Sequence, residues 1–292
     1  MPSVRDLRDR IRSLKNTQQI TKAMKQVAAA KIRRAEAAQK RARPYADALA
    51  QMLHDLIGAV SSVDHPFMQP GKSGAPAGIV LVSADKGLAG AFNSNVIHAA
   101  EALARRQGGA RYYTIGLKAR NAVRRMGMPD HATWALGSGE KIDTARAAAR
   151  RASDDFRHGE ISEIVLVSQQ LITMMSQRPQ TRKLIPILAS DFESARDGEA
   201  GGRPRGAIEF APSPEFVLSR LLPKYLEFTI YSAMLETDAA FFAAQLVAMT
   251  NATDNASKLI DELTIAMNNA RQAAITKELL EIVAGAEALG VE

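Results

Sequence analysis

The stretch LVAMTNATDNASKLIDELTIAMNNARQAA, Leu246 to Ala274, decides the fold of this chain. Apolar or small residues recur in it at alternating spacings of three and four. A mean period of about 3.5 residues is typical of the seam of a left-handed coiled coil. The pattern therefore predicts a long helix that packs along a second helix. The predicted seam positions are Leu246, Met249, Thr253, Ala256, Ile260, Leu263, Met267, Ala270 and Ala274.

The helix extends on both sides of this seam. From Lys224 to Ala284 the chain has no Gly or Pro, although the whole sequence holds 19 Gly and 12 Pro. At 1.5 Å per residue such a segment is roughly 90 Å long. A compact domain could not enclose a helix of that length.

The predicted partner helix is at the other end of the chain. Ser3 to Arg43 also lacks Gly and Pro, and Pro44 is followed by no turn signal, so we interpret it as a kink. Apolar residues at spacings of three and four occur on both sides of Pro44. They are Val4, Leu7, Ile11 and Leu14, and then Ala42, Ala46, Leu49, Leu53, Leu56 and Val60.

Between the two helices, from about Gly71 to Pro214, short apolar runs alternate with helical patterns. Consecutive Ile, Val and Leu are typical of strands that are buried on both faces of a parallel sheet. We therefore predict a parallel, Rossmann-like α/β domain inserted into the coiled coil. The predicted strands are GIVLVSAD, RYYTIG, ISEIVLVS and KLIPIL, and the predicted helices are AFNSNVIHAAEALARRQ, KARNAVRRMG and KIDTARAAARRASDDFRHG.

The predicted domain division follows from these patterns. Residues 1–70 form the N-terminal coiled-coil helix, 71–213 the α/β domain, and 214–292 the C-terminal helix. The polar, Gly- and Pro-rich stretch ESARDGEAGGRPRGAIEFAPSPEF is expected to be a loop. Its last four residues, SPEF, resemble a helix start.

Composition excludes several classes of protein. The chain has no Cys, which rules out disulfides, thiolate metal sites and Cys nucleophiles. No stretch approaches the ~18 apolar residues needed to span a bilayer, and the N-terminus has no apolar signal core. We expect a protein that is made and kept in the cytosol.

Positive charge is concentrated in the first segment. Residues 1–44 hold thirteen Lys or Arg against Asp6, Asp9 and Glu36, whereas the remainder is slightly acidic. Nucleic-acid binding is one hypothesis for such a helix. Against it, no aromatic residue precedes Tyr45, so stacking platforms are absent, and no zinc-finger or helix-turn-helix spacing occurs.

Candidate chemistry in the middle domain is sparse. The turn SADKGLAGAFNSN follows a strand and precedes a helix, where phosphates bind in doubly wound folds, but Gly87 and Gly90 fit no phosphate fingerprint. We prefer a tight turn there. The five His form no metal-binding spacing. We expect no catalytic residue, cofactor or metal, with an enzyme built on residues 71–214 as an alternative.

The non-seam positions of the long helices are unusual. Stretches such as NATDNASK and NNARQAAIT carry small or neutral residues where exposed helices carry Lys and Glu. Such a face is expected to be enclosed by something else.

Three separated motifs resemble one family. The segments Asn16 to Ala46, Val82 to Val96 (VSADKGLAGAFNSNV) and Met249 to Leu289 are similar to the gamma subunit of F-type ATP synthase. The resemblance spans nearly the whole chain. It implies that the two end helices form an antiparallel coiled coil, the central rotor shaft. This shaft would turn inside a ring of three alpha and three beta subunits and couple ion flow through the membrane c ring to ATP synthesis or hydrolysis.

The resemblance also implies partners and contact residues. The alpha and beta subunits, the epsilon subunit and the c ring are the expected partners, with no nucleic acid and no small-molecule substrate. Met24 and Lys25 would lie near the beta lever, and Arg271 and Gln272 would bind a beta loop. The C-terminal end, with Leu279, Ile282 and Val283, would enter an apolar sleeve at the top of the ring.

The family comparison suggests a bacterial subunit, peripheral on the cytoplasmic face of the inner membrane. The chain carries neither the cysteine-containing insertion of plastid relatives nor a mitochondrial transit peptide. It departs from the family at Phe241 and Gln245, where relatives carry a Glu and an Arg. Gln26 stands where a Met is usual, and Ala89 where a Cys or Gly is common. The first departure removes a charged pair from the shaft.

Overall fold

The computed structural model describes residues 3–59, 65–128, 130–137, 139–187, 211 and 213–289. They form two compact units. The helical unit consists of the chain up to Ala28 and from Leu246 onward, and the sheet unit is Ala29–Gln245. Each of the two long helices, α1 (Val4–Ala59) and α5 (Pro214–Leu289), contributes to both units. The sequence-based division at residues 70 and 213 stays a prediction.

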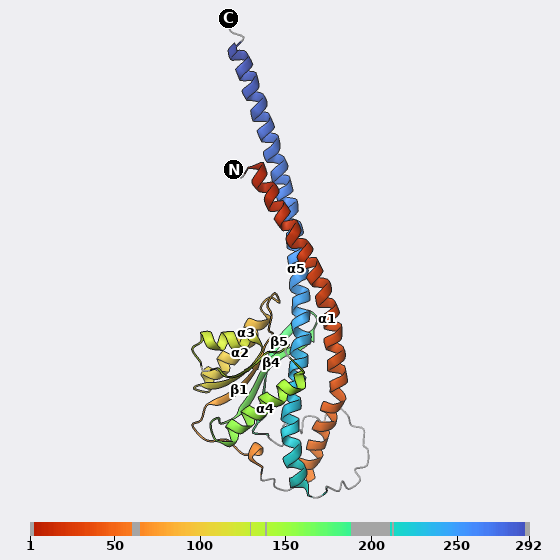
Figure 1. The fold of residues 1–292 in the computed structure, drawn as a ribbon, viewed down its shortest axis with the longest axis vertical. Helices are drawn as coiled ribbons and strands as arrows, with labels where there is room; N and C mark the ends of the chain where they lie inside the picture. The colour runs from red at the N-terminus through yellow and green to blue at the C-terminus, as the bar shows by residue number, and fades with distance from the viewer. Residues whose placement is uncertain are drawn as a thin grey trace. The chain divides into compact units, whose positions relative to one another are not determined.

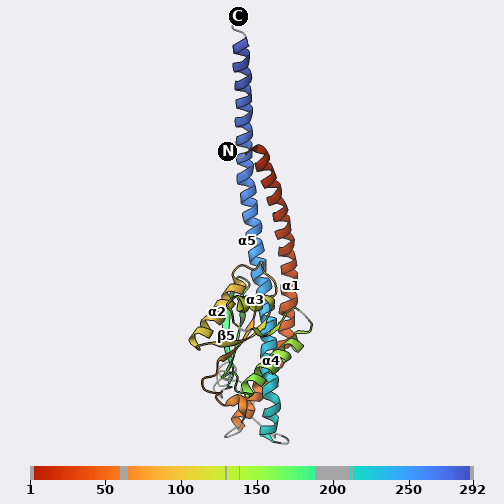
Figure 2. The ribbon, with the colours of Figure 1, turned by 60° about the vertical axis from the view of Figure 1, so that its left-hand side comes forward.

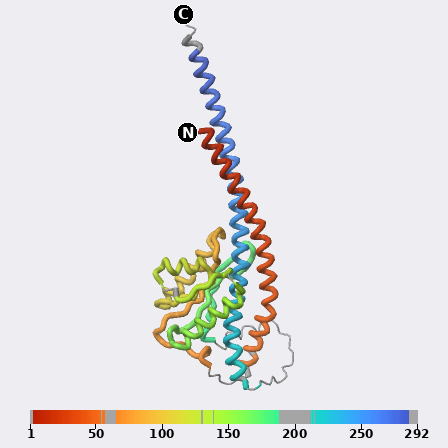
Figure 3. The backbone as a smooth tube through the Cα atoms, viewed as in Figure 1, coloured from red at the N-terminus to blue at the C-terminus, as the bar shows by residue number. Residues whose placement is uncertain are grey.

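Helix α1 begins at a capping box. The Asp6 N–H donates to Ser3 Oγ (3.2 Å), and the Ser3 N–H donates to Asp6 Oδ2 (3.1 Å). Hydrogen bonding between Ser3 and the Asp6 carboxylate holds the pKa of Asp6 below its ordinary value. The helix then continues for 56 residues and passes through Pro44, as expected. Figure 3 traces both long helices as continuous tubes.

Helix α5 has 76 residues and begins where SPEF was expected to start it. Ser213 Oγ accepts a hydrogen bond from the Phe216 N–H at 3.2 Å, and Pro214 occupies the first turn, where a missing N–H costs nothing. A second proline, Pro223, lies inside the helix. The Gly- and Pro-rich loop expected before this helix lies almost entirely outside the described residues.

In the helical unit, α1 and α5 run antiparallel. Gln18 Nε2 donates to Ser257 Oγ at 2.6 Å, and the hydroxyls of Thr21 and Thr253 lie 2.8 Å apart. Residue numbers thus rise along α1 as they fall along α5. The predicted antiparallel pairing of the two terminal helices is confirmed. In Figures 1 and 2, α1 starts part-way along α5, and α5 continues beyond it.

The sheet unit contains one five-stranded sheet in the order β3-β2-β1-β4-β5. Strands β1, β2, β3 and β4 pair in parallel, whereas β4 and β5 are antiparallel. The α/β architecture is confirmed, but the prediction of a parallel sheet is wrong for its last strand. The bounds are β1 Ala77–Val82, β2 Ala110–Ile115, β3 Asp130–Trp134, β4 Ile164–Thr173 and β5 Ser176–Ile185.

The direction of β5 has a local cause. Strand β4 runs on to Thr173, and the chain reverses at Met174 and Met175 into β5, which forms a hairpin with it. A hairpin connection of this length can join only antiparallel strands, because parallel neighbours need a crossover of a dozen or more residues. Among its described residues, only the first three of KLIPIL, Lys183–Ile185, belong to a strand, and they form the end of β5.

Helices cover both faces of the sheet (Figure 1). Strand residues such as Ile79 and Leu81 pack against α2 (Phe92–Arg106) and α3 (Leu117–Arg125). On the other face, Val80 and Val82 pack with α4 (Lys141–Arg157), the end of α1, the first part of α5 and Phe67 of the short helix η1 (Pro66–Met68). Among the described residues, no helix is apolar over enough length to cross a bilayer.

Candidate partner-binding surfaces

The C-terminal part of α5 has no helical partner in the described chain. Gln18 lies fourteen residues after Val4, so the register set by Gln18 and Ser257 brings the start of α1 level with Arg271. Every residue from Arg271 to Gly285 is exposed. We call 271–285 the unpaired end. It carries large apolar side chains that are at least half exposed, namely Ile275, Leu279, Leu280, Ile282 and Val283.

Five of the predicted contact residues lie on this unpaired end. Arg271 and Gln272 are exposed at its beginning, and Leu279, Ile282 and Val283 are exposed further along. The exposed fractions of the last three side chains are 57%, 67% and 58%. The exposed residues of this stretch thus begin with a polar pair and continue with large apolar side chains.

Met24 and Lys25, the contact residues predicted on α1, are half-buried. The large apolar side chains of Ile20 and Val27 lie on either side of them in sequence and are exposed by 60% and 53%. Helix α5 also exposes apolar side chains in the same unit, Leu259 by 46% and Ile265 by 63%. The helical unit therefore exposes large apolar side chains on both of its helices.

The predicted seam residues face α1 to different degrees. Met249 and Ile260 are buried, and Leu246, Leu263 and Met267 are half-buried. On the α1 side, Leu7 and Ile11 are buried, and Val4 and Leu14 are half-buried. Ala274 keeps the seam spacing but is exposed, because α1 begins opposite an earlier point of α5.

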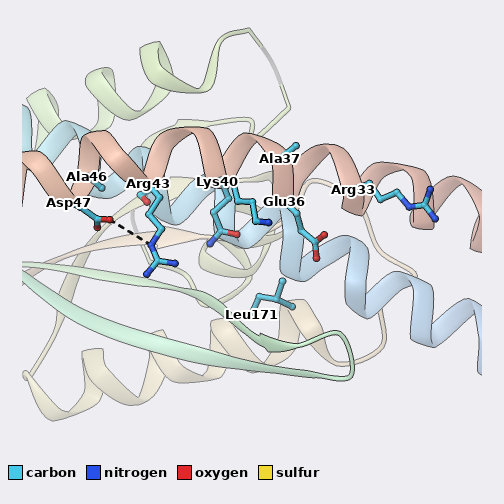
Figure 4. A pocket seen from close by; sticks show the side chains of 10 residues that line it. Arg33, Glu36, Ala37, Lys40, Arg43, Ala46, Asp47 and Leu171 are labelled. Atoms are coloured by element: carbon cyan, nitrogen blue, oxygen red, sulfur yellow. Dashed lines mark ion pairs between the residues drawn. The ribbon is translucent and has the colours of Figure 1, made fainter. Parts of the chain in front are cut away.

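The basic part of α1 borders an open pocket of about 760 Å³ in the sheet unit (Figure 4). Arg33, Lys40 and Arg43 line it, but so do the carboxylates of Glu36 and Asp47. Arg43 Nε lies 3.7 Å from Asp47 Oδ2. Mixed charge of this kind gives no continuous positive track for a phosphate backbone, which argues against the nucleic-acid hypothesis.

The turn after β1 is held by its own side chains. The Asp85 carboxylate accepts hydrogen bonds from the N–H groups of Leu117 (2.9 Å), Leu136 (3.1 Å) and Gly137 (2.8 Å). These residues follow β2 and β3, so one side chain joins three neighbouring loops. Asn93 Oδ1 accepts from the Ala84 N–H at 3.1 Å.

Sequence reasoning found this turn but missed the role of Asp85. The expected tight turn is present, and Gly90 has a φ of +57°, which favours glycine. Leu88 adopts a similar φ of 62°. The Asp85 carboxylate thus binds backbone N–H groups that follow β2 and β3, at the end of the sheet where the strands' carboxyl ends lie.

A charge network surrounds the buried carboxylate of Asp155 beside β2. The Asp155 carboxylate accepts a hydrogen bond from the Tyr113 hydroxyl, lies 2.8 Å from His131 Nε2 and 3.4 Å from Arg151 Nε. Burial, together with the Asp155 hydrogen bond, raises the pKa of Tyr113 far above its ordinary value. Arg111 also lies 3.7 Å from Asp155 and contacts Glu160.

This network bears on metal binding. His131, Asp155 and Glu160 are close enough to share a cation. Both carboxylates are already paired with guanidinium groups, so a cation there would have to displace Arg111 and Arg151 or share the carboxylates with them. The arrangement is a neutralised ion-pair network that joins β2 and β3 to α4.

The sequence departure at Phe241 and Gln245 lies in the sheet unit. Phe241 is 4% exposed and packs edge-to-face on Phe92, with ring centroids 5.6 Å apart. Phe242 packs on Phe241 in turn and receives the Lys31 ammonium 5.3 Å from its ring centroid. The aromatic side chains pack with Ala84, Ala89, Ala240 and Ala244 in one hydrophobic cluster.

Comparison with known proteins covers the whole chain. A family model described as ATP synthase matches residues 3–289. The ATP synthase gamma chain of Heliobacterium modesticaldum is 41% identical, over 99% of this chain and 100% of the relative. That of Pelotomaculum thermopropionicum is 44% identical, again over 99% of this chain and 100% of the relative.

Solved structures share the fold at lower identity. A chain of the Euglena gracilis mitochondrial ATP synthase, in a structure of OSCP, F1 and the c ring, has a TM-score of 0.66 at 16% identity. It covers 98% of this chain and 94% of its own length. A central-stalk and c-ring structure from Tetrahymena thermophila has a TM-score of 0.59 at 21% identity, covering 80% and 99%. This chain belongs to the ATP synthase gamma-chain family.

Proposed function

We propose that this chain is the central rotor shaft of an F-type ATP synthase. The observation that carries the proposal is the apolar surface of the helical unit, which no described part of the chain covers. It includes the unpaired end of α5 together with Ile20, Val27, Leu259 and Ile265. A shaft enclosed by a ring of subunits has a reason to expose such side chains, because the ring buries them.

The two long helices suit torque transmission. A helix resists twisting and bending through its ladder of backbone hydrogen bonds, and a second helix packed along it stiffens the pair. Both α1 and α5 are continuous through their prolines. The polar contacts of Gln18 with Ser257 and of Thr21 with Thr253 also fix the register in which the helices pack.

The small residues of the shaft have a physical role in this proposal. A shaft inside a ring of three similar subunit pairs meets the same surface at several angles. A deep binding hot spot at one angle would trap it there. Ala273 and Ala274 are small and exposed on α5, where large side chains would add such contacts.

The proposal includes specific contacts. Met24 and Lys25 face the lever segments of the beta subunits, Arg271 and Gln272 hydrogen-bond a beta loop, and the apolar unpaired end enters a sleeve at the top of the ring. The sheet unit contacts the epsilon subunit and the c ring. Half-buried Met24 and Lys25 leave only part of each side chain for a partner, whereas the residues of the unpaired end are fully available.

The chemistry belongs to the complex. We propose that this subunit has no catalytic site of its own and needs no cofactor. It couples ion flow through the c ring to ATP synthesis or hydrolysis on the beta subunits by rotating. We further propose a peripheral position on the cytoplasmic face of a bacterial inner membrane.

Reconstitution tests the proposal directly. The purified chain is mixed with cognate alpha and beta subunits at ~150 mM salt, where surface charge is screened beyond about 8 Å. We expect a stable complex with ATPase activity that survives nuclease treatment. A folded chain that does not assemble, or that assembles only through contaminating nucleic acid, would contradict the shaft role.

A further inference from the structure

A second surface, inside the sheet unit, has the features of an anion-binding site. Helix α4 and the first turns of α5 border a pocket of about 370 Å³ next to Phe67. Arg150 and Arg157 line it from α4, and Arg220 and Lys224 line it from α5. The carboxylates in the lining are those of Asp154 and Glu227, so the pocket has an excess of positive charge.

The lining carboxylates are already engaged. Asp154 Oδ1 lies 3.7 Å from Arg157 Nη1, and Glu227 Oε2 lies 2.9 Å from Lys224 Nζ. Within the described chain, Arg150 and Arg220 form no ion pair. Two guanidinium groups from different helices therefore border one pocket without a carboxylate partner. Guanidinium groups bind phosphate oxygens through charge-assisted, often bidentate hydrogen bonds.

Ser153 gives a second, independent indication. Its residue is only 6% exposed, yet it lines the pocket from the inner face of α4. The Ser153 hydroxyl makes no hydrogen bond to any described residue. The hydroxyl oxygen is not fully buried, so it is open to the pocket and available to a ligand there.

Pro223 adds an acceptor to the same wall. Because proline has no N–H, the carbonyl of Ser219, four residues earlier, lacks its usual donor within α5. Ser219 and Pro223 both line the pocket. This carbonyl can accept a hydrogen bond from a ligand hydroxyl. The pocket also has an apolar side, formed by Phe67, Ala149 and Pro223.

Size distinguishes the ligand from a bare ion. One water occupies about 30 Å³ of liquid, so the pocket is several times larger than an inorganic anion needs. It has room for a phosphate group with a short hydroxylated body. We propose that this pocket binds a phosphomonoester, with Arg150, Arg220 and Ser153 on the phosphate and the Ser219 carbonyl on a hydroxyl.

The phosphomonoester has two sources, a free metabolite or a phospholipid headgroup. The test uses the full-length chain with three probes: inorganic phosphate, glycerol 3-phosphate, and phosphatidylcholine vesicles with or without phosphatidic acid. Calorimetry measures the soluble probes, and vesicle co-sedimentation measures the lipid. Saturable binding of glycerol 3-phosphate, tighter than that of phosphate, supports the free ligand. Binding only to vesicles that contain phosphatidic acid supports the headgroup.

Variants separate a built site from general charge. We expect Arg150→Gln and Arg220→Gln each to weaken binding about tenfold or more. Ser153→Ala, which changes no charge, should weaken it severalfold. Arg178→Gln removes an exposed arginine of β5 that is not part of the pocket and should leave binding unchanged.

Two results would overturn the proposal. One is the absence of saturable binding of all three probes. The other is binding that Arg178→Gln weakens as much as Arg150→Gln does while Ser153→Ala has no effect, because surface charge alone would then explain it. Neither result bears on the shaft role, because assembly with alpha and beta subunits is measured separately.

Discussion

Helix α5 contains two stretches with opposite surroundings. From Leu246 to Ala270, the seam positions are buried or half-buried against α1, whereas every residue from Arg271 to Gly285 is exposed. The seam spacing continues to Ala274 without a change in pattern. The difference in burial arises because α1 begins opposite Arg271. A helix seam is therefore buried only as far as the partner helix extends.

The two stretches differ in what stabilises them. The paired stretch gains from apolar burial inside the chain itself. An isolated helix of about fifteen residues is marginal in water, so the unpaired end depends on being a continuation of α5. Its apolar side chains contribute to stability only when a partner covers them.

Proline substitutions should separate the two stretches most strongly. Ile260→Pro removes a helix hydrogen bond, and we expect it to lower the free energy of unfolding by about 3 kcal/mol or more. It should also abolish coupled ATP synthesis while nucleotide binding to beta stays intact. Ile275→Pro is the matched change in the unpaired end and should leave the midpoint of thermal unfolding nearly unchanged. Equal losses of stability, or normal synthesis with Ile260→Pro, would contradict the comparison.

Side-chain truncation should give the next largest effect. Ile260 is 9% exposed and Ile275 is 50% exposed. Ile260→Ala should cost about 2 kcal/mol or more in denaturant unfolding, because it leaves a cavity in the seam. Ile275→Ala should stay within about 0.5 kcal/mol in the isolated chain and should instead weaken assembly with alpha and beta subunits. An effect of Ile275→Ala on unfolding but not on assembly would refute the proposed role of the unpaired end.

The polar layer in the paired stretch should have a smaller effect. Thr21→Val or Thr253→Val alone removes one hydroxyl of a pair 2.8 Å apart, and we expect a loss of about 1 kcal/mol. The double variant should lose less than the sum, because the hydrogen bond between the two hydroxyls can be lost only once. A double-mutant cycle in urea measures this coupling. Strict additivity would mean that the two hydroxyls do not interact.

Enlarging small residues tests the unpaired end without affecting its folding. Ala273→Trp and Ala274→Trp lie on exposed positions, so the free energy of unfolding should change by no more than about 0.5 kcal/mol. In the assembled enzyme, the larger side chains should slow rotation by adding contacts at particular angles. Single-molecule rotation assays provide the measurement. An unchanged rotation rate and torque would remove the argument for small residues.

The smallest expected effect is a pH dependence from Glu236, on α5 before the paired stretch. Burial raises its pKa above 4.5, although the hydrogen bond from the Leu171 N–H opposes the rise. The folded state therefore holds this proton more tightly than the unfolded state. The resulting stabilisation is present below pH 4.5 and is lost as the pH rises through the raised pKa.

Glu236→Gln should therefore raise the unfolding temperature at neutral pH and change it little near pH 4. Glu278→Gln, at an exposed position of the unpaired end, removes no buried charge and serves as the control. Thermal unfolding at the two pH values gives the comparison. A larger gain at pH 4 than at neutral pH would show that the sign is wrong.

Much of this architecture could be predicted from local patterns. The 3.5-residue spacing and the absence of Gly and Pro identified the long helices. The apolar runs at Ile79 and Ile164 identified two central strands. Strand β3 was not predicted, because its sequence, DHATW, is short and has no continuous apolar run. It lies at the edge of the sheet. The direction of β5 depended on the turn at Met174, whose residues carry no strong turn signal.

The binding surfaces were harder to predict. Arg271 and Gln272 were assigned from family resemblance, and no local signal distinguishes them from other exposed polar residues. The point where α5 loses its partner depends on register, which the pairing of Gln18 with Ser257 reveals only in three dimensions. The role of Asp85 is likewise non-local, because its three donors follow β2 and β3 and lie 32 to 52 residues away from it in sequence.

The hydrogen bonds of Asp85 have a consequence for the sheet unit as a mechanical part. In many doubly wound proteins the loops at this end of the sheet are ordered by a bound ligand, so their stability varies with ligand concentration. Here the Asp85 carboxylate binds the loops after β2 and β3 in place of a ligand. Because Asp85 is part of the chain, its effective concentration does not change with metabolism. The loops after β1, β2 and β3 therefore stay ordered whether the cell is rich or poor in nucleotides, as suits a component that must carry load in either state.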